Sequence, residues 1–324
     1  MVRVWFFEFD IRCGAAEAMM RTSNPPHWDV GLTTVDIMYS SKFSASLLAV
    51  LVALLLSACG GGPPPPRHGP EDLAALETGT RLHPSLGTPI GFMRGTPPAD
   101  PEARLVLYVH GTPGEKEGWA DFLVEPVDGT RSLAIDRPGF GASASSGAVP
   151  DLMVQAQSVE PFLPEAGQRP AIVVGHSLGG PIAVAAAMRY PDRIAAVVIL
   201  AGSLDPAQES VMFVQHMAAA GPLRWMLPDW LDVTNQELLP LKGQLEALAA
   251  RIHELTQPVV ILHGTEDDLV PYANVAYMEN SFRWSRKIES ITLIGANHFL
   301  PWMAEQETRR AIRKALALAD APQH

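Results

Sequence analysis

The sequence predicts an α/β fold, in which a mostly parallel β-sheet is covered by helices on both faces. The first observation is a set of short apolar runs, rich in β-branched residues and bounded by turn residues. Such runs are typical of strands buried on both faces. The second observation is that helical patterns separate these runs, which indicates parallel strands joined by helices. The chain has 324 residues, 47% of them apolar, enough for a large packed core.

Six apolar runs predict strands, at residues 105–109, 132–135, 171–174, 196–200, 259–262 and 291–294. Segment 80–94 predicts one or two further strands. Helical periodicity predicts helices at 151–163, 179–190, 272–283 and 304–318. We therefore expect one α/β domain at residues 71–324.

Residues 203–254 interrupt this alternation. They separate two predicted strands by about fifty positions, whereas a crossover between parallel strands needs far fewer. The apolar residues of this insertion have helix-like spacing, and the large ones are Met212, Phe213, Met217, Trp225, Met226 and Trp230. The insertion predicts a small helical cap, or extra helices packed on the core. A cap with this composition favours an apolar pocket for an acyl or aryl group, although such a stripe is also typical of plain core.

Residues 38–58 combine one cation, an apolar run and small residues. Lys42 precedes the apolar run 47–56, which is too short to span a bilayer of about 30 Å unaided. Leu56-Ser-Ala-Cys59 is similar to a lipobox, where bacterial lipoprotein precursors receive lipid on cysteine and are cut before it. We therefore predict a lipoprotein-type signal peptide and lipid attachment at Cys59. A conventional signal peptide and an uncleaved anchor are the alternatives.

The segments on either side of this signal also carry predictions. Residues 1–37 contain acidic side chains that do not suit a cationic leader, namely Glu8, Asp10, Glu17, Asp29 and Asp36. We therefore predict that translation begins at Met38 and that residues 1–37 are a gene-model extension. Residues 59–70 are rich in glycine and proline, which predicts a tether. A tethered domain is expected in the bacterial cell envelope, held to a membrane by the lipid and facing the periplasm or the exterior.

Composition excludes several classes of protein. The formal net charge is −11, and a nucleic-acid binder would normally carry a basic stripe. Cys13 and Cys59 are the only cysteines in the sequence, so neither a disulfide framework nor a cysteine-rich metal site is predicted.

The most specific pattern is Gly175-His-Ser-Leu-Gly179, which follows one predicted strand and opens a helix. In that context Gly-x-Ser-x-Gly predicts a nucleophile elbow, a strained turn that lifts the hydroxyl of Ser177 clear of the backbone. Gly175 and Gly179 fit because a side chain would clash where strand and helix pass closely. The helix N-terminus favours negative charge that develops beside the serine.

A serine hydroxyl needs a base, and the base needs an orienting acid. His298 follows the last predicted strand, in a loop able to bring an imidazole to Ser177. Asp267 follows the strand before it and is the predicted acid. Glu266 and Asp268 are its immediate rivals, and Asp205 is a further candidate.

An oxyanion hole needs backbone N–H groups directed at the tetrahedral intermediate. Leu178 is expected to supply one, because it directly follows the serine. The loop after strand 105–109 reads His110-Gly-Thr-Pro-Gly114, and Pro113 has no N–H. Thr112 is therefore the second predicted donor, and Gly111 leaves room for the substrate.

Taken together, the order Ser177, Asp267, His298 and the loop His110-Gly-Thr-Pro113 resemble the α/β-hydrolase superfamily over about residues 80–320. This resemblance implies an α/β-hydrolase fold with an eight-stranded sheet, a cap after the sixth strand and no cofactor or metal.

The stretch Asp136–Ser143 is similar to that superfamily's Asp-x-x-Gly-x-Gly-x-Ser stretch, for which the resemblance implies a mostly structural role. Epoxide hydrolases and haloalkane dehalogenases share the His-Gly-x-Pro loop, but they attack with aspartate where this chain has Ser177. Epoxide hydrolases also use cap tyrosines, and residues 203–254 contain none.

The sequence therefore predicts a serine hydrolase that cleaves the carboxylic ester of a small or medium hydrophobic substrate through an acyl-enzyme. Thioesterase, lactonase, carbon–carbon hydrolase and perhydrolase chemistry on the same residues are alternatives. A non-catalytic envelope lipoprotein that kept the fold is another. Oligomeric state is not predicted.

Overall fold

The computed structural model describes residues 67–98, 100, 102–209 and 228–322. Residues 66–324 make up one compact unit. It contains a single eight-stranded sheet in the order β1-β2-β4-β3-β5-β6-β7-β8. The strands are β1 Glu77–Leu82, β2 Pro89–Arg94, β3 Arg104–Val109, β4 Thr130–Ile135, β5 Ala171–His176, β6 Ile194–Leu200, β7 Val259–Gly264 and β8 Ile288–Leu293.

The strands from β3 to β8 run parallel, whereas β1 and β2 pair antiparallel at one edge. The predicted eight-stranded, mostly parallel α/β-hydrolase fold is confirmed. Segment 80–94 contributes to both β1 and β2. The central strands are buried along their whole length, as their uninterrupted apolar runs indicate.

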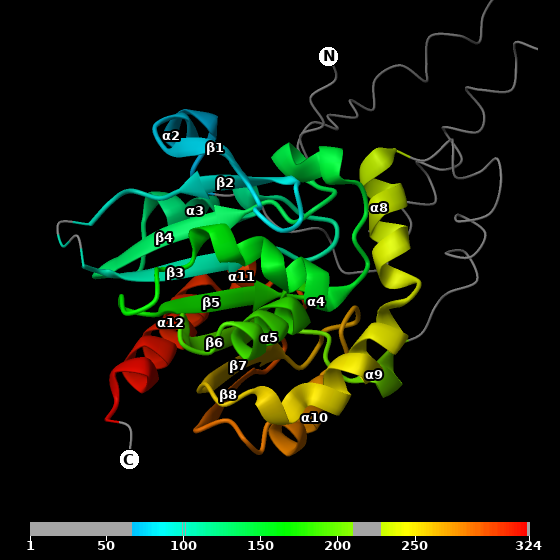
Figure 1. The fold of residues 1–324 in the computed structure, drawn as a ribbon. Coiled ribbons are helices and arrows are strands. Elements are labelled where there is room, and N and C mark those ends of the chain that lie inside the picture. The colour runs from blue at the N-terminus through cyan, green and yellow to red at the C-terminus, as the bar shows by residue number, and fades with distance from the viewer. Residues whose placement is uncertain (1–66, 99, 101, 210–227, 323–324) are drawn as a thin grey trace, which may run out of the picture. The chain divides into compact units, whose positions relative to one another are not determined.

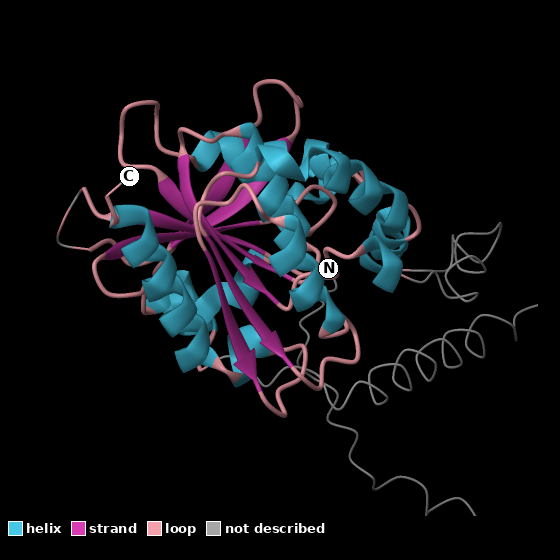
Figure 2. Ribbon diagram, turned by 90° about the horizontal axis from the view of Figure 1, so that it is seen from below, coloured by secondary structure: helices cyan, strands magenta, loops and turns pink. Residues whose placement is uncertain are grey.

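Helices cover both faces of the sheet (Figures 1 and 2). On one face α4, α5, α9 and α10 pack into one apolar core, and on the other α3, α11 and α12 pack into a second. Their bounds are α3 Ala120–Val124, α4 Leu152–Gln155, α5 Gly179–Arg189, α9 Leu241–Arg251, α10 Ala273–Ser281, α11 Leu300–Met303 and α12 Glu305–Asp320. The short α2 spans Pro70–Ala74, and α8 spans Asp229–Leu238.

The insertion between β6 and β7 is described in two parts. Residues 203–209 include a 3₁₀ turn at Pro206–Gln208, and residues 228–254 form α8, α9 and a 3₁₀ turn at Ile252–Glu254. Figure 1 shows α8 and α9 beyond one side of the sheet, at the carboxyl ends of its central strands. Of the large apolar residues that suggested a pocket, five lie outside the described residues, and Trp230 lies on α8.

The structure refines the predicted helix at 151–163 and corrects the predicted strand at 291–294. Residues 152–162 are helical, close to the predicted bounds, but α4 gives way to a 3₁₀ helix at Ala156–Phe162. The last strand ends at Leu293, and Ile294 is 92% exposed. This strand is not buried on both faces, because it lies at the edge of the sheet, and none of its six residues is fully buried.

The end of the predicted tether at 59–70 contacts the domain. Arg67 forms ion pairs with Glu125 and Glu305, at 3.0 and 2.9 Å, and the His68 N–H donates to Asp121. The chain is therefore already held on the domain by residue 67, before α2 begins. Residues 1–37, the signal-peptide prediction at 38–58 and Cys59 lie outside the described residues.

The strand register brings distant loops to one edge of the sheet. Val109 of β3 pairs with Gly175 of β5, and Leu200 of β6 pairs with both His176 and Leu262. The segments that follow these strands therefore leave the sheet side by side. This is the edge at which open α/β sheets bind their ligands.

Candidate active site

Ser177 occupies a tight turn between β5 and α5. Its φ of 54° lies in the left-handed region, which a residue other than glycine seldom adopts. The Ser177 N–H donates to the carbonyl of Leu200 at 3.0 Å, and its carbonyl accepts from the Gly180 N–H at 2.9 Å. Its half-buried side chain forms no hydrogen bond with any described residue. The turn thus presents an unengaged hydroxyl at the edge of the sheet.

Three glycines around this serine leave no room for a side chain. A Cβ at Gly175 would lie 2.1 Å from the carbonyl oxygen of Gly179, and one at Gly179 would lie 2.3 Å from that of Val109. A Cβ at Gly111 would lie 2.8 Å from the Cβ of Ser177. The loop after β3 therefore lies against the serine, and the strand-to-helix turn closes by contact between backbones.

Asp267 and His298 are joined by a hydrogen bond of 2.8 Å between Oδ2 and Nδ1, and both side chains are buried. They follow the neighbouring strands β7 and β8. The other oxygen of Asp267 accepts the N–H groups of Leu269 and Val270, at 3.0 and 2.7 Å. A proton held on Nδ1 of His298 leaves the Nε2 lone pair able to act as a base.

The rival acids lie elsewhere. Glu266 and Asp268 are exposed, although they flank Asp267 in sequence. Asp205 instead caps the 3₁₀ turn that follows it, by accepting the Ala207 N–H at 2.9 Å. Of the four candidate acids, only Asp267 has a hydrogen bond to His298 in the described part of the chain.

A second histidine also faces Asp267. His263 is buried with Nε2 at 2.9 Å from the Val270 carbonyl and 3.4 Å from Oδ2 of Asp267. Burial by itself would raise the pKa of Asp267, but the hydrogen bonds from His263 and His298 outweigh it and hold that pKa well below its usual range. The carboxylate is therefore ionised throughout the range in which histidine titrates.

His176 links the base to the serine turn. Its ring lies 4.8 Å from that of His298, and its Nε2 donates to the His298 carbonyl at 2.9 Å. Burial, and then the nearby His298, lower the pKa of His176 to about 3. The neutral imidazole of His176, the residue before Ser177, thus holds the backbone of His298 through this hydrogen bond.

The loop His110–Gly114 lies opposite the serine turn. In the described residues, no backbone carbonyl accepts the N–H of Thr112 or that of Leu178. The hydroxyl of Thr112 donates to that of Thr234 on α8, at 3.3 Å. The loop therefore lies between the serine and the insertion, with two N–H groups free at its edge and at the start of α5.

Arg137 is the residue whose importance the sequence did not indicate. Its guanidinium is fully buried and forms a bidentate ion pair with Glu237 of α8, at 2.7 and 3.1 Å. It also donates to the carbonyls of His110 and Gly111, at 3.0 and 2.7 Å. The quoted stretch Asp136–Ser143 contained Arg137, but no local pattern singled out Glu237, a hundred residues away.

Asp136, by contrast, has the structural role that was expected. Its buried carboxylate accepts the N–H groups of Lys116 and Ala142, both at 2.9 Å, and pairs with Nζ of Lys116 at 2.8 Å. Gly141 and Gly91 pass so close to it that a Cβ at either would clash. Its oxygens are therefore fully used in holding two loops together.

The described residues contain no group of three or more histidine, cysteine, aspartate or glutamate side chains placed to hold a metal ion. None of their helices has the length and apolar character needed to cross a bilayer.

Comparison with known proteins adds family relationships. Residues 106–311 match the family model described as the alpha/beta hydrolase family. The chain is 35% identical over 258 residues to the 2-hydroxy-6-oxononadienedioate/2-hydroxy-6-oxononatrienedioate hydrolase of Burkholderia vietnamiensis, a match that covers 65% of this chain and 86% of that one.

A second relative is the dihydrolipoyllysine-residue acetyltransferase component of the acetoin cleaving system of Cupriavidus necator. It is 35% identical over 202 residues, which are 53% of this chain and 54% of that protein, so the chain spans only about half of this relative's length. Among solved structures, one described as a membrane phospholipase A, a novel bacterial virulence factor, superposes with a TM-score of 0.58 and 19% identity. That match covers 86% of this chain and 96% of the other, and it shows the fold alone.

Proposed function

Because the chain belongs to the alpha/beta hydrolase family, we propose that it is a serine hydrolase that cleaves a carboxylic ester through an acyl-enzyme on Ser177. The observation that carries this proposal is the buried Asp267–His298 hydrogen bond, at the same sheet edge as a strained turn that presents an unengaged serine. These are the nucleophile, base and orienting acid that acyl transfer requires.

The proposed steps use each of these groups in turn. Nε2 of His298 takes the proton of Ser177 as Oγ bonds to the ester carbonyl carbon, and the carbonyl oxygen becomes an oxyanion. The N–H groups of Thr112 and Leu178 stabilise that oxyanion. As the carbon–alkoxy bond breaks, the imidazolium returns the proton to the leaving alcohol.

Water completes the cycle. His298 takes a proton from water as its oxygen attacks the acyl carbon, and it then protonates Oγ of Ser177 as the carboxylic acid leaves. Asp267, ionised because its pKa is held low, keeps the imidazole in the required tautomer and stabilises the imidazolium.

Hydrolysis of a carbon–carbon bond is the second candidate, and the Burkholderia relative favours it. That relative's substrate is named as a dienedioate, which carries two carboxylates and calls for cations in its site. Among the described residues, Arg137 is paired with Glu237, and Lys116 with Asp136 and Glu117. Comparison of a dicarboxylate substrate with p-nitrophenyl esters would separate the two activities.

The test is hydrolysis of p-nitrophenyl esters from acetate to palmitate by residues 66–324, beside Ser177→Ala. We expect turnover that falls on the order of 10⁶-fold in the variant, with a best chain length that reports the size of the acyl pocket. A folded protein that takes a fluorophosphonate on Ser177 but cleaves no ester would redirect the search to thioesters, lactones, peracids or carbon–carbon bonds. No labelling at all would favour the non-catalytic envelope protein.

We also propose that the mature protein begins at Cys59, carries lipid there and is held in the bacterial cell envelope. The lipobox-like residues before Cys59 support this. Mass spectrometry of the natural protein should find a diacylated N-terminal cysteine and no peptide from residues 1–37. A peptide from that region would overturn the start at Met38, and an unmodified Cys59 would overturn the anchor.

A further inference from the structure

We propose that the buried ion pair of Arg137 and Glu237 is a positioning device that aims the Thr112 N–H at the oxyanion and couples it to the insertion helix α8. This rests on the proposed function, since it gives Thr112 the task of binding an oxyanion. Neither residue touches the reacting atoms, so both act through the loop at 110–112.

Arg137 acts on the peptide unit that joins Gly111 to Thr112. The carbonyl of Gly111 and the N–H of Thr112 belong to the same planar trans peptide, so they point in opposite directions. Nη2 of Arg137 donates to that carbonyl at 2.7 Å, and Nε donates to the preceding carbonyl, of His110, at 3.0 Å. Holding the Gly111 oxygen on one side therefore fixes the direction of the Thr112 N–H on the other.

The guanidinium of Arg137 is itself held by further hydrogen-bond acceptors. Its remaining N–H groups donate to Glu237, at 2.7 and 3.1 Å, and to Oε1 of Gln155, at 2.7 Å. With the two carbonyls this makes five acceptors for five N–H groups, so the planar group has one fully satisfied orientation. Gln155 in turn donates to Glu237 at 2.6 Å. A lysine could not satisfy these acceptors together.

The helix α8 also contacts the loops that carry Thr112 and Arg137. Thr234 meets Thr112 hydroxyl to hydroxyl at 3.3 Å, one turn before Glu237 on the helix. Val233 packs so closely on Gly139 that a Cβ there would lie 2.7 Å from its Cγ1. The helix therefore touches the oxyanion loop and the Arg137 loop together, and a shift of α8 would move the Thr112 peptide.

Because this ion pair is buried, we infer that it serves to orient the loop at 110–112 rather than to stabilise the fold. Arg137 and Glu237 are almost entirely shielded from water, with side-chain exposures of 0% and 1%. Buried ion pairs are often no more stabilising than apolar residues of similar volume, because both charges lose their hydration. Five directed hydrogen bonds fix the orientation of the guanidinium, whereas an apolar contact would not.

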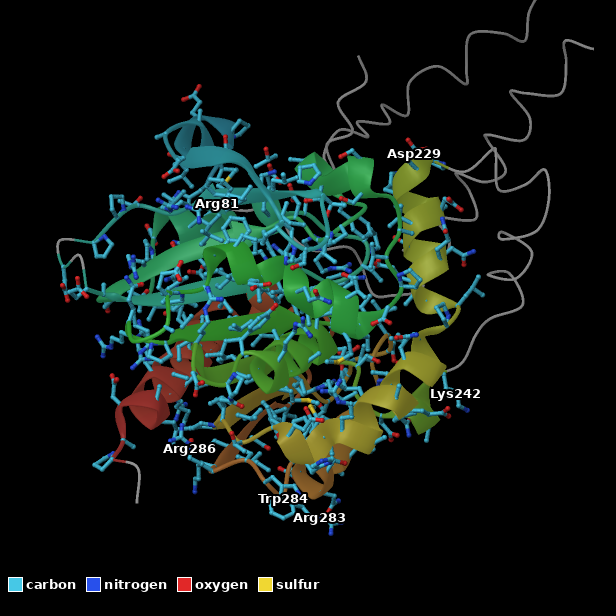
Figure 3. All side chains as sticks on the ribbon, in the orientation of Figure 1. Arg81, Asp229, Lys242, Arg283, Trp284 and Arg286 are labelled. Carbon is cyan, nitrogen blue, oxygen red and sulfur yellow. The ribbon has the colours of Figure 1, made fainter. Side chains whose placement is uncertain are left out.

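Two conservative variants test the proposal. Arg137→Lys keeps the positive charge but loses the planar guanidinium and its five N–H donors. Glu237→Gln keeps the side-chain shape and one acceptor but loses the negative charge. Asp229→Asn is the matched control, because Asp229 is exposed at the start of α8 (Figure 3) and forms no ion pair among the described residues. Each is measured for kcat and KM on the best p-nitrophenyl ester, for the rate of Ser177 phosphonylation, and for Tm.

We expect kcat and phosphonylation to fall together by about 10- to 100-fold in both variants, with KM changed less than about twofold, because an oxyanion donor acts on the transition state. Asp229→Asn should match the wild type. Amide exchange of residues 110–112 should be faster in the two variants.

Folded variants that keep both rates within about twofold of wild type would overturn this inference and leave the proposed function intact. If Arg137→Lys does not fold, Glu237→Gln decides by the same criterion, since it preserves the packing. A wild-type chain without Ser177-dependent activity or labelling would overturn the proposed function and this inference with it.

Discussion

The turn at Ser177 and the loop at Thr112 lie against each other, yet they are held by different means. Backbone contact holds the turn, because Gly175 and Gly179 let strand and helix pass with no space for a side chain. The loop at Thr112 is held by side chains from far along the chain, Arg137 and Glu237. One half of the proposed acyl-transfer site is thus built locally, and the other half depends on the insertion.

This difference has a consequence for substitutions. A backbone contact cannot relax without moving a strand or a helix, so a change in the turn should disturb the fold itself. Side-chain contacts can rearrange, so a change around the loop should leave the fold largely intact and alter the chemistry.

The contact between Asp267 and His298 is likewise made by side chains, and after the loss of Ser177 itself its loss should have the largest effect on kcat. Asp267→Asn should lower kcat on the order of 10⁴-fold, because an amide no longer enforces the tautomer of His298 and does not stabilise the imidazolium. Steady-state kinetics on p-nitrophenyl esters provides the measurement. The neighbours Glu266→Gln and Asp268→Asn are exposed and should stay within about twofold of wild type. A comparable loss in Asp268→Asn would move the acid assignment to that residue.

The turn at Ser177 should be least tolerant of an added methyl group. In Gly175→Ala the new Cβ would lie 2.1 Å from the Gly179 carbonyl oxygen, so strand or helix has to move. We expect a loss of more than about 4 kcal/mol in unfolding free energy, or no soluble protein. Gly243→Ala is the control, because Gly243 is exposed in α9 with open space around it, and alanine there should add about 0.5–1 kcal/mol. Urea unfolding that shows equal stability for both variants would contradict the backbone-contact account.

Gly111→Ala adds the same methyl group to the loop at Thr112. Its Cβ would lie 2.8 Å from the Cβ of Ser177 and 3.3 Å from Oγ, in a segment that side chains hold. We expect the loop to shift, with a stability loss of about 1–2 kcal/mol. The displaced Thr112 N–H should lower kcat by about 10- to 100-fold. Unfolding as severe as in Gly175→Ala would show that loop and turn do not differ in the way described.

The smallest expected effect concerns acid stability. His176 is neutral in the fold, with its pKa lowered to about 3, whereas in the unfolded chain histidine has a pKa of about 6.5. Between these values the unfolded chain binds the extra proton, so the stability is present above about pH 6.5 and is lost as pH falls. One such proton contributes a slope of about 1.4 kcal/mol per pH unit.

His176→Gln keeps a donor for the His298 carbonyl but does not titrate, so its stability should fall less steeply between about pH 6 and pH 4.5. Chemical unfolding at a series of pH values measures the slopes. His110, whose pKa is also lowered by burial and then by Arg137, contributes equally to both proteins and cancels. Identical slopes in wild type and variant would mean that His176 is protonated in the fold.

Much of this architecture was readable from the sequence. The apolar runs located the strands because central parallel strands are buried on both faces, and the rule failed at β8 because an edge strand is half exposed. Gly175-His-Ser-Leu-Gly179 identified the serine turn, since its glycines and its strained residue are neighbours in the chain. The order of serine, acid and base followed from the strand ends.

Other features could be identified only from the folded chain. Sequence spacing left Glu266, Asp267 and Asp268 as rivals, and only burial against His298 distinguishes Asp267. The partnership of Arg137 and Glu237 joins residues a hundred positions apart, and no local pattern marks it. The sequence alone determined the sheet and the serine turn, because backbone sterics and apolar periodicity act between near neighbours. The tertiary structure decided which charges meet, because a buried charge is tolerated only where folding brings its partner within hydrogen-bond reach.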